Sequence, residues 1–306
     1  MNSSNLDARN TPEWRQSLQG KKRVRRDQRP KNPKGMYLTE NDRAIVRLVY
    51  DYRILSQRQL EQLLGKSRGT VQEKLIRLFH HQFLDRIFMP VVPGIGRSPT
   101  LYVLDKQGIA LLRHEGIEDF SGLPSKRGSS FFFEHTLAIN DVRIAMSRAC
   151  QERGWRVAEW RDENAMKADY DRVRTRTRSG RTLDIPILPD SYFVIEIPDR
   201  GVSHFFLELD RGTMTQERFR QKLVGYVAYH KVGGYERRFK SAGLRVLTVT
   251  DKPGRFPKLV ESARSVEGIG RRFWFAQLEA VTASSVLTEP VWTVAGSDDK
   301  ATLFSG

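Results

Sequence analysis

The run His204–Thr213 limits the fold more than any other part of this sequence, because it places two acids in an apolar segment. Glu208 and Asp210 stand two positions apart. Side chains alternate between the two faces of a strand, so both carboxylates are predicted to project from one face and the apolar residues between them from the other. Buried carboxylates are costly unless a metal ion, a lysine or an arginine pairs with them. The fold must therefore bring such a partner to this strand.

Two other groups near this run in the sequence carry suitable chemistry. Asp190 follows Pro189 upstream and offers a third carboxylate, and Lys222 lies downstream and offers a cation. With 306 residues, the chain is long enough for two domains. These groups all fall in the second half, so we expect that half to hold the chemistry.

The charge of the chain favours a polyanionic partner, and double-stranded DNA is the expected one. There are 52 Lys and Arg residues against 36 Asp and Glu residues, which gives a formal net charge of +16 and a pI near 10.1. Such an excess is typical of nucleic-acid-binding proteins. A basic surface that only maintains solubility is the alternative.

Cysteine content and hydropathy exclude several classes of protein. Cys150 is the only cysteine, so neither an intramolecular disulfide nor a cysteine-based zinc finger can form. No apolar run approaches the roughly 20 residues that span a bilayer, and the N-terminus lacks the apolar core of a signal peptide. We therefore expect a cytoplasmic protein with no membrane partner.

Residues 1–37 are predicted to form a basic, disordered arm. Lysines and arginines crowd residues 21–34, where two prolines also interrupt any helix, and like charges repel one another. Such an arm either tracks DNA phosphates or is simply a solvated terminus.

Residues 38–119 are predicted to form a winged helix-turn-helix domain. Thr39 and Ser56 begin capping boxes, and a third helix opens at Ser67. The pattern then changes to two strands, over 86–92 and 100–104, which are joined by a Gly- and Pro-rich tip and followed by a short helix over 106–114. Three short helices followed by a hairpin are typical of that fold.

The third helix is the expected recognition helix of this domain. Arg68 and Gln72 have the chemistry for bidentate contacts to guanine and adenine, whereas Lys74 and Arg77 suit phosphates. The candidate DNA-contacting residues are Arg68, Thr70, Gln72, Lys74, Arg77 and, at the hairpin tip, Arg97. A protein-binding role for the module is the alternative.

After a linker over 120–130, residues 131–306 are predicted to form an α/β domain with a mixed sheet, which makes the chain α+β overall. The expected order is a helix (134–153), three strands (155–160, 187–197 and 204–209), a helix (215–231) and a strand (244–250). Residues 167–181 are expected to be a charged loop. The apolar pieces over 273–304 receive no assignment.

The order Pro189-Asp190 and then Glu208-Leu209-Asp210 resembles the signature of PD-(D/E)XK nucleases, with Asp210 where that signature has lysine. The resemblance implies a nuclease-like domain in which Asp190 and Glu208 hold Mg²⁺, Asp210 assists, and Lys222 from the following helix lies near the attacking water. It also allows Glu134 as a further acid. Two alternatives stay open: a nuclease-like fold without activity, and a salt-bridge network with Arg211, Arg218 or the arginines of 167–181.

Residues 38–292 also resemble the replication-relaxation family of plasmids and other mobile elements. The resemblance rests on Leu101–Gly108, Glu134–Val142, Leu188–Asp190, Phe206–Thr213 and Lys222–Tyr226. It implies a DNA-binding accessory protein in replication or relaxation, with a relaxase or a replication initiator as its protein partner, and it leaves enzymatic activity open. Two alternatives stay open. One is a non-catalytic transcriptional or copy-number regulator, for which half-sites about one helical turn apart would be evidence of a homodimer. The other is a scaffold that recruits a relaxase or a replication initiator.

Overall fold

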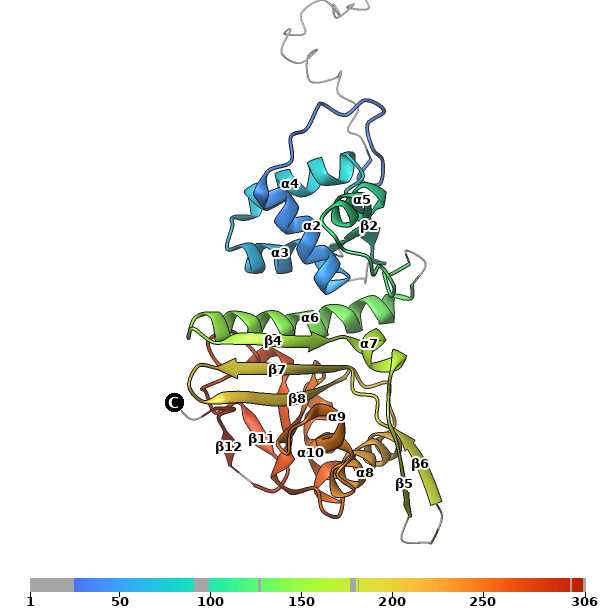
Figure 1. Cartoon of the computed structure of the whole chain (residues 1–306), viewed down its shortest axis with the longest axis vertical. Helices are drawn as coiled ribbons and strands as arrows, with labels where there is room; N and C mark the ends of the chain where they lie inside the picture. The colour runs from blue at the N-terminus through green and yellow to red at the C-terminus, as the bar shows by residue number, and fades with distance from the viewer. Residues whose placement is uncertain are drawn as a thin grey trace, which may run out of the picture.

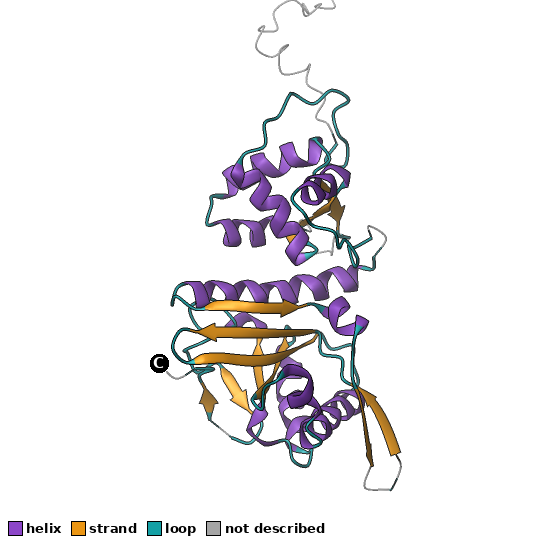
Figure 2. Cartoon of the chain, viewed as in Figure 1, coloured by secondary structure: helices purple, strands orange, loops and turns teal. Residues whose placement is uncertain are grey.

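The computed structural model describes residues 25–90, 99–125, 128–176, 180, 182–297 and 299–304. Within them the chain forms an N-terminal module, residues 25–120, which lies on one long helix of a larger sheet module, residues 128–304 (Figure 1). Figure 2 shows that helices dominate the N-terminal module, whereas strands form the centre of the sheet module. The chain is therefore a mixed α/β protein.

Three short helices build the N-terminal module, and each starts where its capping residue predicts. They are α2 (Glu40–Tyr52), α3 (Gln57–Leu64) and α4 (Arg68–His80). The hydroxyls of Thr39, Ser56 and Ser67 each accept a backbone N–H from the first turn of the helix that follows. Their apolar faces meet in one core that contains Ile45, Leu60 and Leu75, among others.

A small sheet completes this module. Its strands are β1 (Leu55–Ser56), β2 (Leu84–Phe88) and β3 (Thr100–Leu104), in the order β1-β3-β2, and α5 (Lys106–His114) follows. A Cβ atom at Gly108 would lie 2.3 Å from the carbonyl oxygen of Phe83, so only glycine allows α5 to pack this closely on the chain before β2. The predicted hairpin tip, including Arg97, lies outside the described residues.

Part of the predicted basic arm is held against the N-terminal module. Arg29 donates to the backbone oxygens of Phe79 and Leu84 and pairs with Asp105 at 2.6 Å. Its guanidinium also lies over the Phe79 ring, 4.4 Å from the centroid. Arg29 is therefore a packing residue, which the charge pattern did not predict. Residues 1–24 of the arm lie outside the described residues.

The sheet module is built on a mixed sheet whose described strands run in the order β12-β11-β10-β9-β8-β7-β4. The strands are β4 (Arg156–Arg161), β7 (Ser191–Ile197), β8 (Gly201–Asp210), β9 (Leu244–Thr250), β10 (Phe273–Gln277), β11 (Trp292–Val294) and β12 (Lys300–Ala301). β9 is parallel to both β8 and β10, and the other neighbouring pairs are antiparallel. The predicted strand over 244–250 is confirmed residue for residue.

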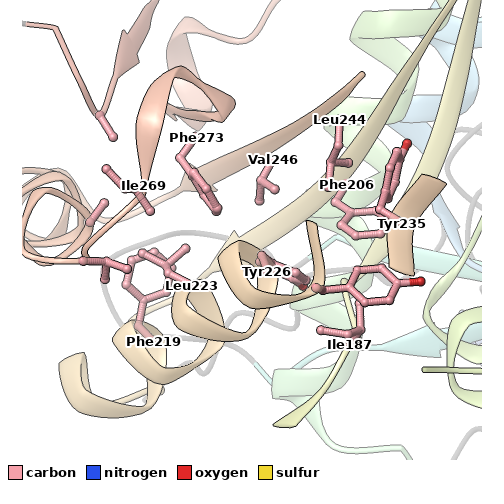
Figure 3. Packing of buried hydrophobic residues seen from close by; sticks show 14 of the residues in the cluster. Ile187, Phe206, Phe219, Leu223, Tyr226, Tyr235, Leu244, Val246, Ile269 and Phe273 are labelled. Atoms are coloured by element: carbon pink, nitrogen blue, oxygen red, sulfur yellow. The ribbon is translucent and has the colours of Figure 1, made fainter. Parts of the chain in front are cut away.

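Helices cover both faces of this sheet, and β8 contributes to both cores. The helix α6 (Ser130–Gln151) packs on the face that holds Phe205 and Leu207. The helices α8 (Gln216–Lys231), α9 (Gly234–Phe239) and α10 (Phe256–Arg264) cover the other face. There Phe206 packs among Tyr226, Tyr235 and Leu244, as Figure 3 shows. The predicted alternation along this strand is confirmed.

The prediction of a loop over 167–181 is wrong. The helix α7 (Glu163–Ala168) is followed by β5 (Arg172–Arg176), which pairs in antiparallel fashion with β6 (Thr182–Pro186). Every second residue of β5 is an arginine, so charge masked an alternation that is typical of strands. The apolar pieces over 273–304, which the sequence left unassigned, include the strands β10, β11 and β12.

The two modules share α6 as a common wall. One side of this helix places Phe133 and Ile144 in the cores of the N-terminal module. Asn140, which is buried, donates to the carbonyl oxygens of Tyr52 and Ile54 at 3.1 and 2.7 Å. These bonds satisfy the backbone between α2 and β1, so the modules are joined by specific polar contacts as well as by apolar packing.

Among the described helices, none combines the length and the apolar content that crossing a membrane requires.

Candidate functional site

The strand β8 presents Glu208 and Asp210 on the face that α8 covers, together with Phe206. Asp190 comes directly before β7 and is fastened to β8 on both sides of Glu208. Its backbone N–H donates to the oxygen of Leu207 at 3.0 Å, and its Oδ2 accepts the N–H of Leu209 at 2.7 Å. The structure thus brings two of the three predicted carboxylates together.

Glu208 receives two donors from α8. Lys222 Nζ lies 2.5 Å from Glu208 Oε2, and the Tyr226 hydroxyl donates to Oε1. The predicted partner Lys222 is therefore in place. Tyr226 was missed, although it lies four residues after Lys222 and so on the same face of the helix. Glu208 is 5% exposed, so this pair is largely withdrawn from water.

Asp190 is ionised at neutral pH and is held by a histidine. His135 of α6 places Nε2 3.5 Å from Asp190 Oδ1. Burial alone would raise the pKa of Asp190, but the His135 hydrogen bond, the Lys222 charge and the Leu209 N–H together lower it. Burial likewise opposes the charged form of His135, yet the Asp190 carboxylate raises the pKa of the histidine. His135 was not predicted as a site residue, although it lies in the segment Glu134–Val142 that carries part of the family resemblance.

Glu208 is the acid of this group that resists ionisation. Burial and the nearby Asp190 charge raise its pKa from 4.5 to about 7, although Lys222 and Tyr226 counteract them. The acidic charges also raise the pKa of Lys222 despite its burial. Lys222 counteracts the charges of both Glu208 and Asp190, so it compensates Glu208 only in part. The cluster of Asp190, Glu208, Lys222, Tyr226 and His135 therefore holds a proton that leaves near neutral pH.

Asp210 stands apart from this cluster. Arg255 donates Nε and Nη2 to its two oxygens at 2.8 and 3.0 Å, and the Gly212 N–H donates to Oδ1 at 2.9 Å. Asp210 is thus fixed by a bidentate guanidinium. Arg255 carried no signal in the sequence, because 45 residues separate the partners. Neither Arg211 nor Arg218, which had been considered, fills this role.

The further acid that the nuclease resemblance allowed, Glu134, is also engaged elsewhere. It pairs with Arg211 at 2.9 Å, and Arg211 binds Asp251 at 3.1 Å as well. The guanidinium of Arg211 lies over the ring of Phe131, 5.7 Å from its centroid. This network borders the cluster on the α6 side without supplying it with a free carboxylate.

The carboxylate oxygens that were predicted to hold Mg²⁺ contact donors from the protein itself. Across the part of the chain that the structure describes, no three His, Cys, Asp or Glu side chains are grouped to hold a metal ion. Both oxygens of Glu208 already accept bonds from Lys222 and Tyr226, and those of Asp190 face His135 and the Leu209 N–H. Mg²⁺ binds carboxylate oxygens, so at this site the ion would have to share or displace these donors.

The surface of α4 forms a second candidate site. Arg68, Thr70 and Gln72 are exposed on its first turns. Lys74 was predicted to contact phosphate, but it instead pairs with the fully buried Asp42 of α2 at 3.0 Å. Arg77 is only partly exposed. Figure 1 places α4 on the side of the N-terminal module away from α6, so the other module leaves this surface open.

Comparison with known protein families gives a match that covers much of the chain. The family model described as replication-relaxation matches residues 46–245, from within α2 to within β9. It therefore covers both candidate sites, and it spans more than half of the chain. No curated protein and no solved structure matches the chain.

Proposed function

The chain belongs to the replication-relaxation family, and from that premise we propose that it is a sequence-specific DNA-binding accessory protein in the replication or relaxation of a plasmid or another mobile element. The observation that carries this proposal is the open N-terminal end of α4. Arg68 and Gln72 are exposed there, and neither side chain has a hydrogen-bond or ion-pair partner among the described residues. Residues that recognise bases must be available in this way.

The arrangement of the N-terminal module supports a winged helix-turn-helix. In that fold the second helix of the motif enters the major groove and its first turns meet base edges. Here α3 and α4 would be the motif, with α2 packed behind them and β2 and β3 as the wing. The net charge of +16 favours the approach to a polyanion. Lys74 would contribute by holding α2 against α4 rather than by touching DNA.

Arg68→Ala and Gln72→Ala are each expected to weaken binding to the preferred DNA sequence about 5- to 150-fold, because a bidentate base contact gives about 1–3 kcal/mol of discrimination. The site is first obtained by selection from a random pool, and fluorescence anisotropy then measures affinity for that site and for a scrambled duplex. Arg47→Ala is the matched control, since Arg47 is an exposed helical arginine whose partner is Asp51. Unchanged sequence preference in both α4 variants would contradict the recognition role.

The order of elements from α6 to β9 supports a nuclease-like sheet module. A helix, three antiparallel strands, a helix and a strand parallel to the third follow one another, once the short helices α7 and α9 and the β5–β6 hairpin are set aside. Asp190 and Glu208 would correspond to the two acids of that class, and Lys222 of α8 would stand in for the lysine that Asp210 replaces in the signature. We propose that in this chain the group stabilises the module and does not cleave DNA.

No nicking of supercoiled plasmid DNA is expected in the presence of Mg²⁺ or Mn²⁺, since the carboxylate oxygens are already bonded within the protein. The measurement is a gel assay of supercoiled and open-circular DNA with the wild-type protein. Metal-dependent nicking that disappears in both Asp190→Ala and Glu208→Ala would refute the proposal and establish a nuclease. Lys222→Ala then tests whether the lysine takes part.

A further inference from the structure

A narrow hairpin of β5 and β6 extends from the sheet module at the end of the molecule opposite α4 (Figure 1). Alternate residues of a strand project from the same face. Arg172, Arg174 and Arg176 of β5 therefore lie on one face of this hairpin, and all three are exposed. Val173 between them is buried against α8 and its neighbours. The hairpin thus has one face for packing and one that presents arginines.

The hairpin is anchored to the sheet module through its apolar face and its base. Ile185 of β6 packs against α8 so closely that a Cβ atom at Gly225 would lie 2.7 Å from its Cγ2. At the base of the hairpin, the Tyr229 hydroxyl donates to Asp171, and Arg238 binds the same carboxylate at 3.2 Å. The base and the apolar face of the hairpin are therefore fastened to α8 and α9.

The charges on this face are only partly neutralised. Asp184 accepts Arg172 Nε at 3.0 Å, whereas Arg174 and Arg176 have no side-chain partner in the described part of the chain. A cleft of about 1080 Å³ beside α8 adjoins the hairpin. The charged residues that line it are Arg176, Arg220, Lys231, Arg272, Glu217 and Glu267. Cations therefore outnumber acids on the face and in the cleft.

We propose that the arginine face of the β5–β6 hairpin is a second DNA-binding surface, which contacts the phosphates of double-stranded DNA without regard to sequence. Arginine presents a planar fork of donors that suits phosphate. Alternate residues of a strand lie about 6.6 Å apart, close to the rise of two nucleotides along one DNA strand. A two-stranded hairpin also fits the major groove.

This surface would bind a segment of DNA different from the one under α4. The two surfaces lie at opposite ends of the molecule, separated by α6 and the sheet (Figure 1). A protein with two such surfaces gains affinity for long DNA, because binding at one end raises the effective concentration of DNA at the other. The proposal rests on the proposed function in assigning DNA to both surfaces, but it invokes other residues and another mode of contact.

The test measures affinity for a long random-sequence duplex as a function of salt. The variants are Arg174→Ala with Arg176→Ala, and the same two positions changed to lysine. Each lost phosphate contact lowers the salt slope by about 0.9, so we expect the alanine pair to lower it by about 1.8 and the lysine pair to leave it nearly unchanged. Between 50 and 200 mM salt the affinity of the alanine pair would then fall about 10-fold less than that of wild type.

Arg156→Ala with Arg200→Ala is the control. Both residues are exposed near the turn between β7 and β8, outside the β5–β6 hairpin, and the double change removes the same amount of charge. An alanine pair at 174 and 176 that matches this control in slope and affinity would overturn the second surface and leave the α4 proposal intact. If the alanine pair at 174 and 176 has a reduced salt slope, but Arg68→Ala and Gln72→Ala keep the sequence preference of wild type, only the recognition role of α4 is overturned. A wild-type protein that binds no DNA would overturn both.

Discussion

Arg255→Ala is expected to destabilise the folded protein by about 3–5 kcal/mol, because removing one partner of a buried ion pair leaves the other charge buried and unpaired. Arg255 comes from the short helix η1 (Pro253–Arg255), which leads into α10, and it binds both oxygens of Asp210. The Asp210 side chain is only 4% exposed. Without the guanidinium, this carboxylate would keep the Gly212 N–H but no cation. Urea-induced unfolding at pH 7.5, followed by circular dichroism, measures the difference.

Two further variants isolate the cause of that loss. Lys258→Ala on α10 changes an exposed cation and should stay within about 0.5 kcal/mol of wild type. Asp210→Asn combined with Arg255→Met removes both charges and should recover much of the lost stability, since no unpaired buried charge then remains. A cost below about 1 kcal/mol for Arg255→Ala would show that Asp210 does not depend on this partner.

Local signals explain why much of the fold followed from the sequence. The helix starts after Thr39, Ser56 and Ser67 depend on bonds within a single turn, so the residues that decide them are sequence neighbours. The faces of β8 follow from alternation alone. Lys222 was a candidate partner because it lies only 14 residues after Glu208 and because the nuclease resemblance allows a lysine from the following helix.

Long-range pairing explains what the sequence did not reveal. Lys74 occupies an outward position by helical periodicity, yet Asp42 on another helix binds it. The periodicity of one helix does not reveal what lies opposite. The same reason hides His135 from Asp190, since they come from α6 and from the residue before β7. The side chains that contact the three acids, such as His135, Lys222 and Arg255, likewise come from other elements.

Stability should also fall as the pH rises from about 4.5 through 7, because of Glu208. Its pKa is about 7 in the folded protein and near 4.5 when the chain is unfolded. Between these values the folded protein holds a proton that the unfolded chain has released, so raising the pH favours unfolding. The stabilising effect is complete below pH 4.5 and lost above 7, and the shift corresponds to about 3 kcal/mol.

Glu208→Gln separates this effect from the other groups that titrate in the same range. The amide cannot ionise, so the stability of wild type relative to the variant should fall by about 3 kcal/mol between pH 4.5 and 8. His135 also has a raised pKa and loses stabilisation in the same direction, but it is present in both proteins and cancels in the difference. Asp190, whose pKa is lowered, acts only at more acidic pH. A difference that stays constant over this range would mean that Glu208 is ionised throughout and that its charge is fully balanced by Lys222, so that no proton is held in the cluster.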